Sequence, residues 1–350
     1  MILTVVGARP QFIKAAALSL AFKKAGINEQ IVHTGQHYDE KMSKVFFEEL
    51  GIPGVVKNLS IGSGQHGAQT GEMLVGIEEH INQNQSDIKA LLVYGDTNST
   101  LAGALAAAKL HIPIIHVEAG LRSFNRTMPE EINRVITDHI STYLFCSSKE
   151  GVNHLKNEGI TKNVFNVGDI MYDAVKSFIP YAKAPQEIES KSARYNLITI
   201  HRPSNTDDIQ RLQTILTGIG KIEESCYWPV HPRNKATLNQ LVLPKNLVLC
   251  EPFSYFEMLY AIKNSVKVIT DSGGLQKEAY WLKKPCITVR PQTEWIETLD
   301  NNWNQLCDGS IDSIVNCYQN DPIENTWKSI YGEGNASILI AGTIKTSLFS

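Results

Sequence analysis

Short apolar runs alternate with stretches of helical periodicity along nearly the whole chain. Apolar runs of about four to eight residues, bounded by turn-forming residues, are typical of buried strands. In the first half of the chain we predict such strands at Met1–Val6, Glu29–Thr34, Ile88–Tyr94, Ile112–Val117, Tyr143–Cys146 and Val164–Val167. The helices predicted between them include Phe12–Ala25, Lys41–Leu50 and Leu101–Lys109. Strands that are apolar throughout and alternate with helices indicate a parallel sheet covered on both faces.

A more polar stretch, residues 178–194, interrupts this pattern and is predicted to be a linker. Strands are then predicted at Leu197–Ile200, Trp228–His231, Leu247–Cys250, Val266–Thr270 and Cys286–Val289. We therefore expect two Rossmann-like, doubly wound α/β domains, residues 1–177 and 195–334, that face a cleft. Residues 335–350 are expected to form a C-terminal helix that packs back onto the first domain. A chain of 350 residues agrees with two domains of roughly 150 residues each.

The bulk composition excludes several classes of protein. A net charge of −3 gives no reason to expect a nucleic-acid partner or binding to an anionic membrane. No apolar run reaches the ~18 residues that a membrane-spanning helix needs. The six cysteines show no C-x-x-C spacing, and the N-terminus lacks the features of a signal peptide. We therefore expect a cytoplasmic protein with reduced thiols, in which an anionic ligand would need a local cluster of cations.

Two predicted strands lead through glycine turns into helices. In doubly wound sheets, ligands bind at the carboxyl ends of the strands. Arg9 and Lys14 lie one turn apart where the first helix begins, and could bind an anion there; surface cations are the alternative. Ser272, Gly273 and Gly274 open a helix after Val266–Thr270, where backbone N–H groups could contact a phosphate. A tight structural turn is the alternative for the two glycines.

Titratable residues follow other predicted strands. Asp96 comes just after one strand, but it could simply cap the next helix. Glu118 ends a buried strand, which is harder to explain structurally because a buried charge must be paired. Glu130 lies in a first helical turn, where a carboxylate suits the helix dipole. His201 and Arg202 follow the first strand of the second domain, and either a catalytic or a structural role is open.

Motifs for cofactors and metals are absent or out of place. Residues 62–67 match G-x-G-x-x-G, but they do not clearly follow a strand. The acid about 20 residues further on, Asp87, precedes a strand instead of ending one. We interpret 62–67 as a flexible loop and not as a nicotinamide site. With no zinc-ligand spacing, no G-x-S-x-G and no Walker loop, we expect neither a cofactor nor a metal.

The motifs taken together identify a resemblance that covers almost the whole chain. They are GARPQFIK (7–14), HTGQHY (33–38), YGDTNST (94–100), HVEAGLRS (116–123), MPEEINRV (128–135), HRPSN (201–205), PVHP (229–232) and TDSGGLQKEA (270–279). In order and spacing the chain resembles the non-hydrolysing UDP-N-acetylglucosamine 2-epimerases. That resemblance implies the two-domain glycosyltransferase-B (GT-B) architecture, a UDP-sugar substrate and a homodimer.

The resemblance also implies roles for individual residues. Asp96, Glu118 and Glu130 would be the acid/base carboxylates, with the two roles left open among them, and His201 would lie near the leaving phosphate. Ser272, Gly273 and Gly274 would hold the diphosphate, Glu278 would bind the ribose, and Pro252–Tyr255 would line the uracil pocket. The remaining residues expected to contact substrate are Arg9, Lys14, Arg122, Arg134, Arg202, His231, Phe253, Arg290, Thr293 and Glu294.

The chemistry implied by this resemblance explains the demand for cations and carboxylates. The C2 hydrogen of UDP-N-acetylglucosamine is not acidic, since no adjacent carbonyl can take the charge. In the family's route, anti elimination of UDP removes that proton and gives 2-acetamidoglucal. Syn re-addition of UDP then gives UDP-N-acetylmannosamine, a precursor for surface polysaccharides. This route needs cations and N–H dipoles at the leaving group, and carboxylates with tuned pKa values near C2, in a site closed to water.

Several positions depart from the family pattern. Gln11 stands where the family usually has Glu, and Trp295 where it commonly has Arg. In residues 36–39 only Gln36 and His37 match the motif that binds a second UDP-N-acetylglucosamine as activator, so such activation is not assumed. The GARPQFIK and TEWIE variants are similar to a subgroup acting on UDP-2,3-diacetamido-2,3-dideoxy-glucuronic acid. A GT-B glycosyltransferase, a hydrolysing relative and an inactive nucleotide-sugar sensor are three further hypotheses for the function.

Overall fold

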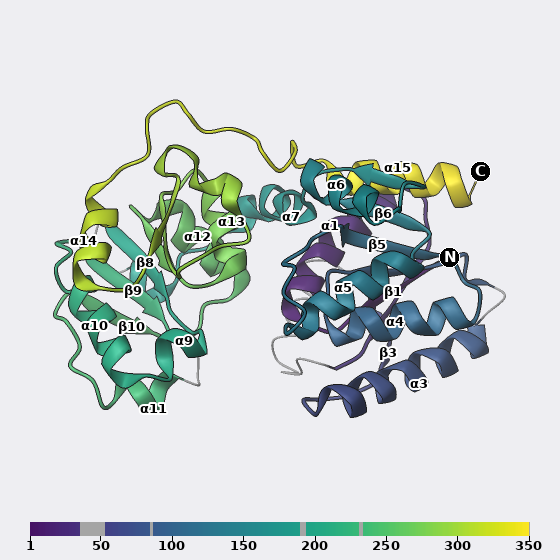
Figure 1. Ribbon diagram of the computed structural model, residues 1–350, viewed down its shortest axis with the longest axis horizontal. Coiled ribbons are helices and arrows are strands. Elements are labelled where there is room, and N and C mark those ends of the chain that lie inside the picture. Colours follow the sequence, from purple (N-terminus) through teal and green to yellow (C-terminus); the bar gives the residue numbers. More distant parts are fainter. Residues whose placement is uncertain (36–52, 85–86, 190–193, 231–233, 350) are drawn as a thin grey trace. The chain divides into compact units, whose positions relative to one another are not determined.

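The computed structural model describes residues 1–350 apart from 36–52, 85–86, 190–193, 231–233 and 350. Its contacts divide the chain into two compact units (Figure 1). Unit 1 comprises Met1–Ser177 and Tyr331–Ser350, and unit 2 comprises Phe178–Ile330. Each unit contains one parallel sheet flanked by helices. The expected fold class, two doubly wound parallel-sheet α/β domains, is confirmed.

The sheet of unit 1 has seven strands in the order β3-β2-β1-β4-β5-β6-β7. These strands are β1 (Ile2–Val6), β2 (Glu29–His33), β3 (Val55–Asn58), β4 (Ala90–Tyr94), β5 (Ile114–Ala119), β6 (Tyr143–Cys146) and β7 (Val164–Asn166). Every residue of β1, β4 and β5 is buried, as expected for central strands covered on both faces.

Helices flank this sheet on both faces (Figure 1). They are α1 (Arg9–Ala25), α3 (His66–Asn84), α4 (Asn98–Lys109), α5 (Pro129–Ile140), α6 (Lys149–Asn157), α7 (Ile170–Phe178) and α15 (Ala336–Leu348). The C-terminal helix α15 packs against α1, and α4 packs against both α3 and α5. Asp173 of α7 accepts hydrogen bonds from the backbone N–H groups of Ala336 (3.1 Å) and Ser337 (2.8 Å), which caps α15.

The sheet of unit 2 has six strands in the order β10-β9-β8-β11-β12-β13. These strands are β8 (Tyr195–Thr199), β9 (Ser225–Pro229), β10 (Leu247–Cys250), β11 (Val268–Thr270), β12 (Cys286–Val289) and β13 (Asn304–Cys307). The helical segments are η2 (Ile179–Tyr181), α8 (Gln186–Glu189), α9 (Pro203–Thr206), α10 (Ile209–Ile219), α11 (Lys235–Leu238), α12 (Tyr255–Asn264), α13 (Gly273–Trp281), η4 (Ile296–Asn302) and α14 (Ile311–Gln319).

Both sheets reverse their winding at one point. In unit 1 the strand order reverses between β1 and β4, and in unit 2 between β8 and β11. At such a switch point the loops that follow the two strands turn away from each other, which leaves a crevice in which ligands bind. The loops that begin at Gly7 and Gly95 therefore border this position in unit 1, and those that begin at Ile200 and Asp271 border it in unit 2.

The structure differs from the sequence-based prediction in several elements. Strands β3 and β13 were not predicted, because three of the four β3 residues are exposed and β13 begins with Asn and Gln. Residues 66 and 67 of the G-x-G-x-x-G match belong to α3 and not to a loop. Within the stretch predicted as a linker, α8 places Ile188 in the apolar core of unit 2. The predicted helix Lys41–Leu50 lies outside the described residues.

Within the part of the chain that the structure describes, there is no helix long and apolar enough to cross a membrane.

Candidate active site

The switch point of unit 1 is built around Gly7 and Gln11. A Cβ atom on Gly7 would collide with the hydroxyls of Ser99 and Thr34, so the turn after β1 requires glycine. Gln11, buried in the first turn of α1, accepts hydrogen bonds from the N–H groups of Gly7 (2.8 Å) and Ala8 (3.0 Å). Its amide donates to the Tyr94 carbonyl (2.8 Å) at the end of β4. An ionised Glu could not make this donation, so the neutral amide ties the two switch-point loops together.

Lys14 and Glu118 form a buried ion pair at this switch point. Glu118 has φ +71°, and the β5–β6 register shifts between Val117 and Ala119, so Glu118 occupies a β-bulge. This left-handed conformation is uncommon for a non-glycine residue, and such strain gathers at functional sites. Burial alone would lower the pKa of Lys14, but the Glu118 carboxylate outweighs it and the pKa is raised. Lys14 therefore stays charged.

Asp96 is held by the first turns of α5. Arg134 forms ion pairs with both Asp96 and Glu131, the latter at 2.9 Å. Burial would raise the pKa of Glu131, but hydrogen bonds from Ser123 and Phe124, together with Arg134, lower it. The Arg134 guanidinium thus holds the Asp96 side chain, and the contact with substrate that the sequence resemblance implies for Arg134 stays a prediction.

The other predicted residues of unit 1 have different surroundings. Glu130 is exposed in the first turn of α5, and Arg9 is partly exposed where α1 begins. The Arg122 guanidinium is buried and pairs with Asp138 (2.7 Å) and, through two nitrogens, with Glu158 (2.7 Å each). These bonds give Arg122 a structural role. Substrate binding by Arg122 stays a prediction.

A buried histidine–carboxylate pair that the sequence reasoning missed supports the β4 loop. His116 Nδ1 lies 2.7 Å from Asp138, and its Nε2 lies 2.8 Å from the Gly95 carbonyl oxygen. Both side chains are fully buried. Burial would raise the pKa of Asp138, but His116 and Arg122 lower it. Asp138 lies in the last turn of α5 with no motif around it, so no local sequence signal marked it.

In unit 2, Asp271 locks the two switch-point loops together. Its fully buried carboxylate follows β11 and accepts hydrogen bonds from the backbone N–H groups of His201 (3.1 Å) and Arg202 (2.9 Å). It also accepts one from the Asn205 amide (3.0 Å). The His201 ring nitrogen Nδ1 lies 3.4 Å from Asp271, while its imidazole is 41% exposed. Asp271 was missed, although a carboxylate ending a buried strand is the signal that singled out Glu118.

The helix α13 begins beside this crevice with an uncapped N-terminus. Ser272 is the N-cap residue, but its side chain makes no capping hydrogen bond. Neither Gly273 nor Gly274 has positive φ. A Cβ on Gly273 would have no neighbour closer than 3.7 Å, and one on Gly274 would meet no described atom within 4 Å. The fold therefore does not require glycine at these two positions, which favours a ligand over a structural turn as their reason.

The remaining predicted residues of unit 2 are placed as follows. Arg290 pairs with Glu294 through two bonds (3.0 and 2.8 Å). Burial would raise the pKa of Glu294, but Arg290 and Arg202 lower it. Thr293 donates to Gln276 of α13 (2.7 Å), and Glu278 is buried in α13. Phe253 belongs to the apolar core, and His231 lies outside the described residues.

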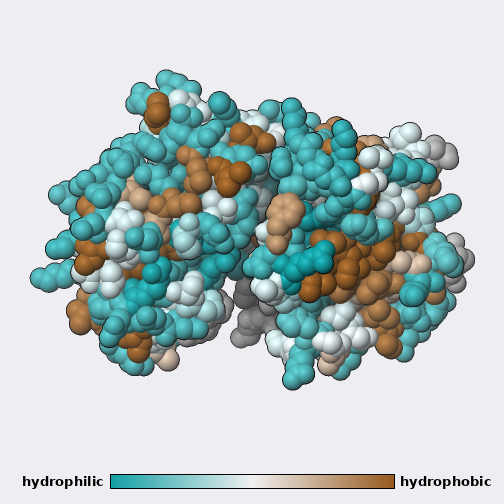
Figure 2. Space-filling view, viewed as in Figure 1, coloured by the Kyte–Doolittle hydropathy of each residue, from teal (hydrophilic) through white to brown (hydrophobic). Residues whose placement is uncertain are grey.

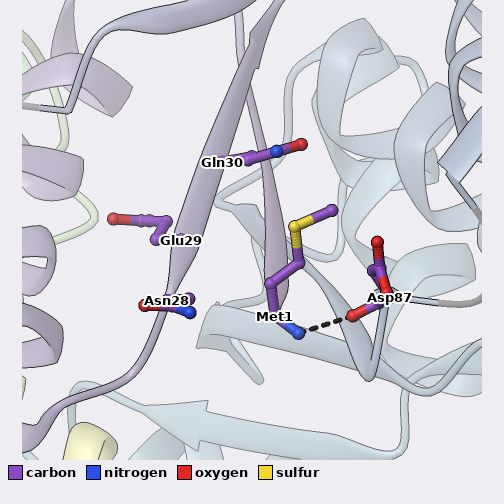
Figure 3. Close-up of a pocket in the computed structure, with 5 residues that line it drawn as sticks. All are labelled: Met1, Asn28, Glu29, Gln30 and Asp87. Carbon is purple, nitrogen blue, oxygen red and sulfur yellow. Dashed lines mark hydrogen bonds between the residues drawn. The ribbon is translucent and has the colours of Figure 1, made fainter.

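A cavity of about 450 Å³ lies elsewhere, at the amino ends of β1 and β2 (Figure 3). Met1, Asn28, Glu29, Gln30 and Asp87 line it. None of these residues belongs to either switch point. Among the described residues, no group of three or more His, Cys, Asp or Glu side chains could hold a metal ion.

Comparisons with known proteins agree in identifying the family. The profile of the UDP-N-acetylglucosamine 2-epimerase family matches residues 21–345. A UDP-N-acetylglucosamine 2-epimerase homolog of Methanococcus maripaludis is 48% identical over 98% of this chain and 99% of its own. A UDP-2,3-diacetamido-2,3-dideoxy-D-glucuronate 2-epimerase of Pseudomonas aeruginosa is 45% identical over 97% of this chain and 98% of its own.

A solved structure is similar across both units. The Methanocaldococcus jannaschii UDP-GlcNAc 2-epimerase, in complex with UDP-GlcNAc and UDP, superposes with a TM-score of 0.88 at 40% identity. The match covers 99% of this chain and 100% of the other. The GT-B fold class is thereby confirmed, as is the resemblance found in the sequence. This chain belongs to the UDP-N-acetylglucosamine 2-epimerase family.

Proposed function

We propose that the protein is an isomerase that inverts C2 of UDP-N-acetylglucosamine without hydrolysing it, giving UDP-N-acetylmannosamine. The reaction removes UDP together with the C2 proton and then adds both back, with the proton returning to the opposite face. Family membership and the two switch-point crevices support this proposal. Its cellular role would be supply of a precursor for surface polysaccharides.

Unit 2 supplies the groups that bind the nucleotide and stabilise it as it leaves. The uncapped N–H groups of α13 suit the diphosphate, because a helix N-terminus carries partial positive charge and free donors. Arg202 adds a full positive charge beside Gly273, since its guanidinium nitrogen Nη2 lies 3.9 Å from the point where a Cβ on Gly273 would stand. We assign His201, held by Asp271, to the leaving phosphate, and Glu278 to the ribose. These groups stabilise charge that grows as the C1–O bond breaks.

Unit 1 supplies the groups that remove and return the C2 proton. The strongest support for the proposal is the environment of Glu118. Glu118 is buried, its backbone has the strained left-handed conformation, and its carboxylate pairs with the charged Lys14 at the carboxyl end of a central strand. Asp96, fixed by Arg134, follows the neighbouring strand. Two carboxylates with different partners can differ in proton affinity, as an acid and a base in one reaction must. Glu130 is the third candidate.

The experiment that tests this function uses UDP-N-acetylglucosamine as the sole substrate. An epimerase forms UDP-N-acetylmannosamine without any acceptor, whereas a GT-B glycosyltransferase leaves the substrate unchanged. A hydrolysing relative releases free N-acetylmannosamine and UDP, and an inactive sensor forms nothing. We expect Asp96→Asn, Glu118→Gln and His201→Ala each to lower turnover by about 10²- to 10⁴-fold with the fold intact. Normal rates in all three variants would refute the assignment.

A second candidate substrate is UDP-2,3-diacetamido-2,3-dideoxy-glucuronic acid. The observation in its favour is the 45% identity, over nearly the whole chain, to the Pseudomonas aeruginosa enzyme named for that substrate. The elimination chemistry at C1 and C2 would be the same. Comparing kcat/KM for the two UDP-sugars decides between them, and the preferred substrate has the larger value.

We further propose a cytoplasmic homodimer. The six free cysteines support a reducing compartment. Figure 2 shows apolar residues gathered over α4 and α5 of unit 1. Exposed apolar side chains on the helices that pack there include Val75 of α3, and Ile132 and Ile136 of α5. This face would suit a subunit interface. Sedimentation of the parent protein should give twice the mass of one chain. The double variant Ile132→Asp, Ile136→Asp should sediment with the mass of a single chain.

A further inference from the structure

Two N–H donors from different segments converge beside the first residue of α13. Trp295 lies in the loop between β12 and η4, and its indole nitrogen is 3.7 Å from the point where a Cβ on Gly273 would stand. The Arg202 guanidinium nitrogen Nη2 is 3.9 Å from the same point. An anion bound at the N-terminus of α13 would therefore meet the indole N–H as well as the backbone N–H groups and the guanidinium.

The Trp295 loop is tied to α13 itself. Gln276, in the first turns of α13, donates to the Ser272 carbonyl (3.2 Å) and accepts a hydrogen bond from the Thr293 hydroxyl (2.7 Å). The Thr293 hydroxyl oxygen in turn accepts from the Trp295 backbone N–H (3.2 Å). These bonds hold the Trp295 backbone in a set position relative to the helix start, as a preorganised donor requires.

A buried cation lies against the face of the same ring. Lys277 is 4% exposed, and its Nζ lies 3.7 Å from the centroid of the Trp295 ring and 5.5 Å from that of Trp281. A cation over an indole is attracted by the negative face of the ring. It also draws electron density from the ring, which makes the N–H proton more positive and a better donor to an anion. Lys277 therefore both holds the indole and strengthens it as a donor.

We propose that Trp295 is a substrate-binding residue that donates its indole N–H to a diphosphate oxygen of the UDP moiety, with Lys277 as its positioning residue. The inference deepens the proposed function, because it rests on binding of UDP at α13. Trp295 adds a neutral donor of fixed direction beside the charged Arg202. A hydrogen bond to a charged group contributes about 1.5–3 kcal/mol, so its loss weakens binding by roughly 10- to 150-fold.

The test compares Trp295→Phe with the parent enzyme in titrations with UDP and with uridine. Phenylalanine keeps an aromatic face for Lys277 but has no N–H donor. We expect UDP to bind roughly 10- to 150-fold more weakly to the variant, and uridine, which has no phosphate, to bind equally to both. Trp303→Phe is the matched control, because the Trp303 indole N–H donates to Thr326 (3.3 Å) within the same unit. It should bind UDP as the parent does.

A second readout uses the folded parent enzyme and does not depend on the variant. The chain has five tryptophans, so an ¹⁵N spectrum contains only five indole N–H signals to assign. The signal that is absent from the spectrum of Trp295→Phe belongs to the Trp295 indole. In the parent this signal should shift downfield when UDP is added and should not move when uridine is added. Lys277→Met should shift that signal upfield before UDP is added and weaken UDP binding, and Lys277→Arg should restore both.

The outcomes separate this inference from the function beneath it. If the parent neither binds UDP nor epimerises the substrate, the proposed function itself is wrong. If the parent does both, two results overturn the inference alone. One is equal UDP affinity in Trp295→Phe and the parent, and the other is an indole signal that UDP leaves in place.

Discussion

Replacing Gly274 by alanine separates the needs of the fold from those of the ligand. Gly274 lies in the first turn of α13, its φ is not positive, and an added Cβ would meet no described atom within 4 Å. Alanine reduces the conformational freedom of the unfolded chain, so at such a position it stabilises a protein by about 0.4–1 kcal/mol. We therefore expect Gly274→Ala to raise the free energy of unfolding by that amount.

The same methyl group should oppose binding of UDP. It would stand where the diphosphate approaches the N–H groups of α13, and a hydrogen bond to a charged group contributes about 1.5–3 kcal/mol. Loss of one such bond corresponds to a UDP dissociation constant roughly 10- to 150-fold higher. The variant should thus be slightly more stable and clearly weaker in binding, a combination that a structural glycine would not give.

Both effects can be measured in one protein preparation. All five tryptophans lie in unit 2, so their fluorescence during urea unfolding reports on the unit that carries the change. Isothermal titration with UDP gives the affinity. Gly342→Ala is the control for the affinity measurement and should bind UDP as the parent does, since Gly342 lies in helix α15 of unit 1 with no described atom within 4 Å of its Cβ position. Unchanged UDP affinity in Gly274→Ala would refute the idea that the glycines make room for a phosphate.

Three further predictions concern buried carboxylates. Lys14→Met should lower the free energy of unfolding by about 3–5 kcal/mol because it leaves Glu118 buried without its partner, and adding Glu118→Gln should recover part of that loss in urea unfolding. Asp271→Asn should lower turnover at least about 10-fold with the pH profile shifted, since the amide is uncharged and its NH2 group cannot accept the hydrogen bonds that one carboxylate oxygen now accepts from the His201 loop; an unchanged pH profile would contradict that role. Burial raises the pKa of Glu29 to about 7, so its stabilising effect is complete below the unfolded pKa near 4.5 and is lost as pH rises through 7. Unfolding followed by circular dichroism should show parent stability falling by up to about 3 kcal/mol from pH 5 to pH 8, with a smaller fall in Glu29→Gln; equal slopes would refute it.

The buried strands could be predicted from the sequence because their pattern reflects burial on both faces. Tyr143–Cys146 and Cys286–Val289 are confirmed with the predicted bounds. The edge strands β3 and β13 were missed for the same physical reason. Both strands are partly exposed, and their sequences carry polar residues that interrupt the apolar run. The edge strand Leu247–Cys250 is also partly exposed, but it is apolar throughout and was predicted with its bounds.

The candidate site could be predicted only where its residues follow strands. Asp96 and Ser272 follow strands and Glu118 lies at the end of β5, so position alone singled out these three residues. The partners of these residues depend on tertiary contacts between segments far apart in the sequence. Nothing local therefore revealed that Arg134 would pair with Asp96, or that Asp138 would pair with Arg122. The bulge at Glu118 likewise arises from sheet register, which apolar patterning alone does not show.

If UDP leaves together with the C2 proton, the hydrogen on C2 must exchange with solvent during each turnover. The enzyme is incubated with UDP-N-acetylglucosamine in heavy water, and C2 of the product is read by NMR. We expect deuterium at C2 of UDP-N-acetylmannosamine, together with a small steady amount of free UDP and 2-acetamidoglucal. A product that keeps its original hydrogen at C2 would rule out the elimination route.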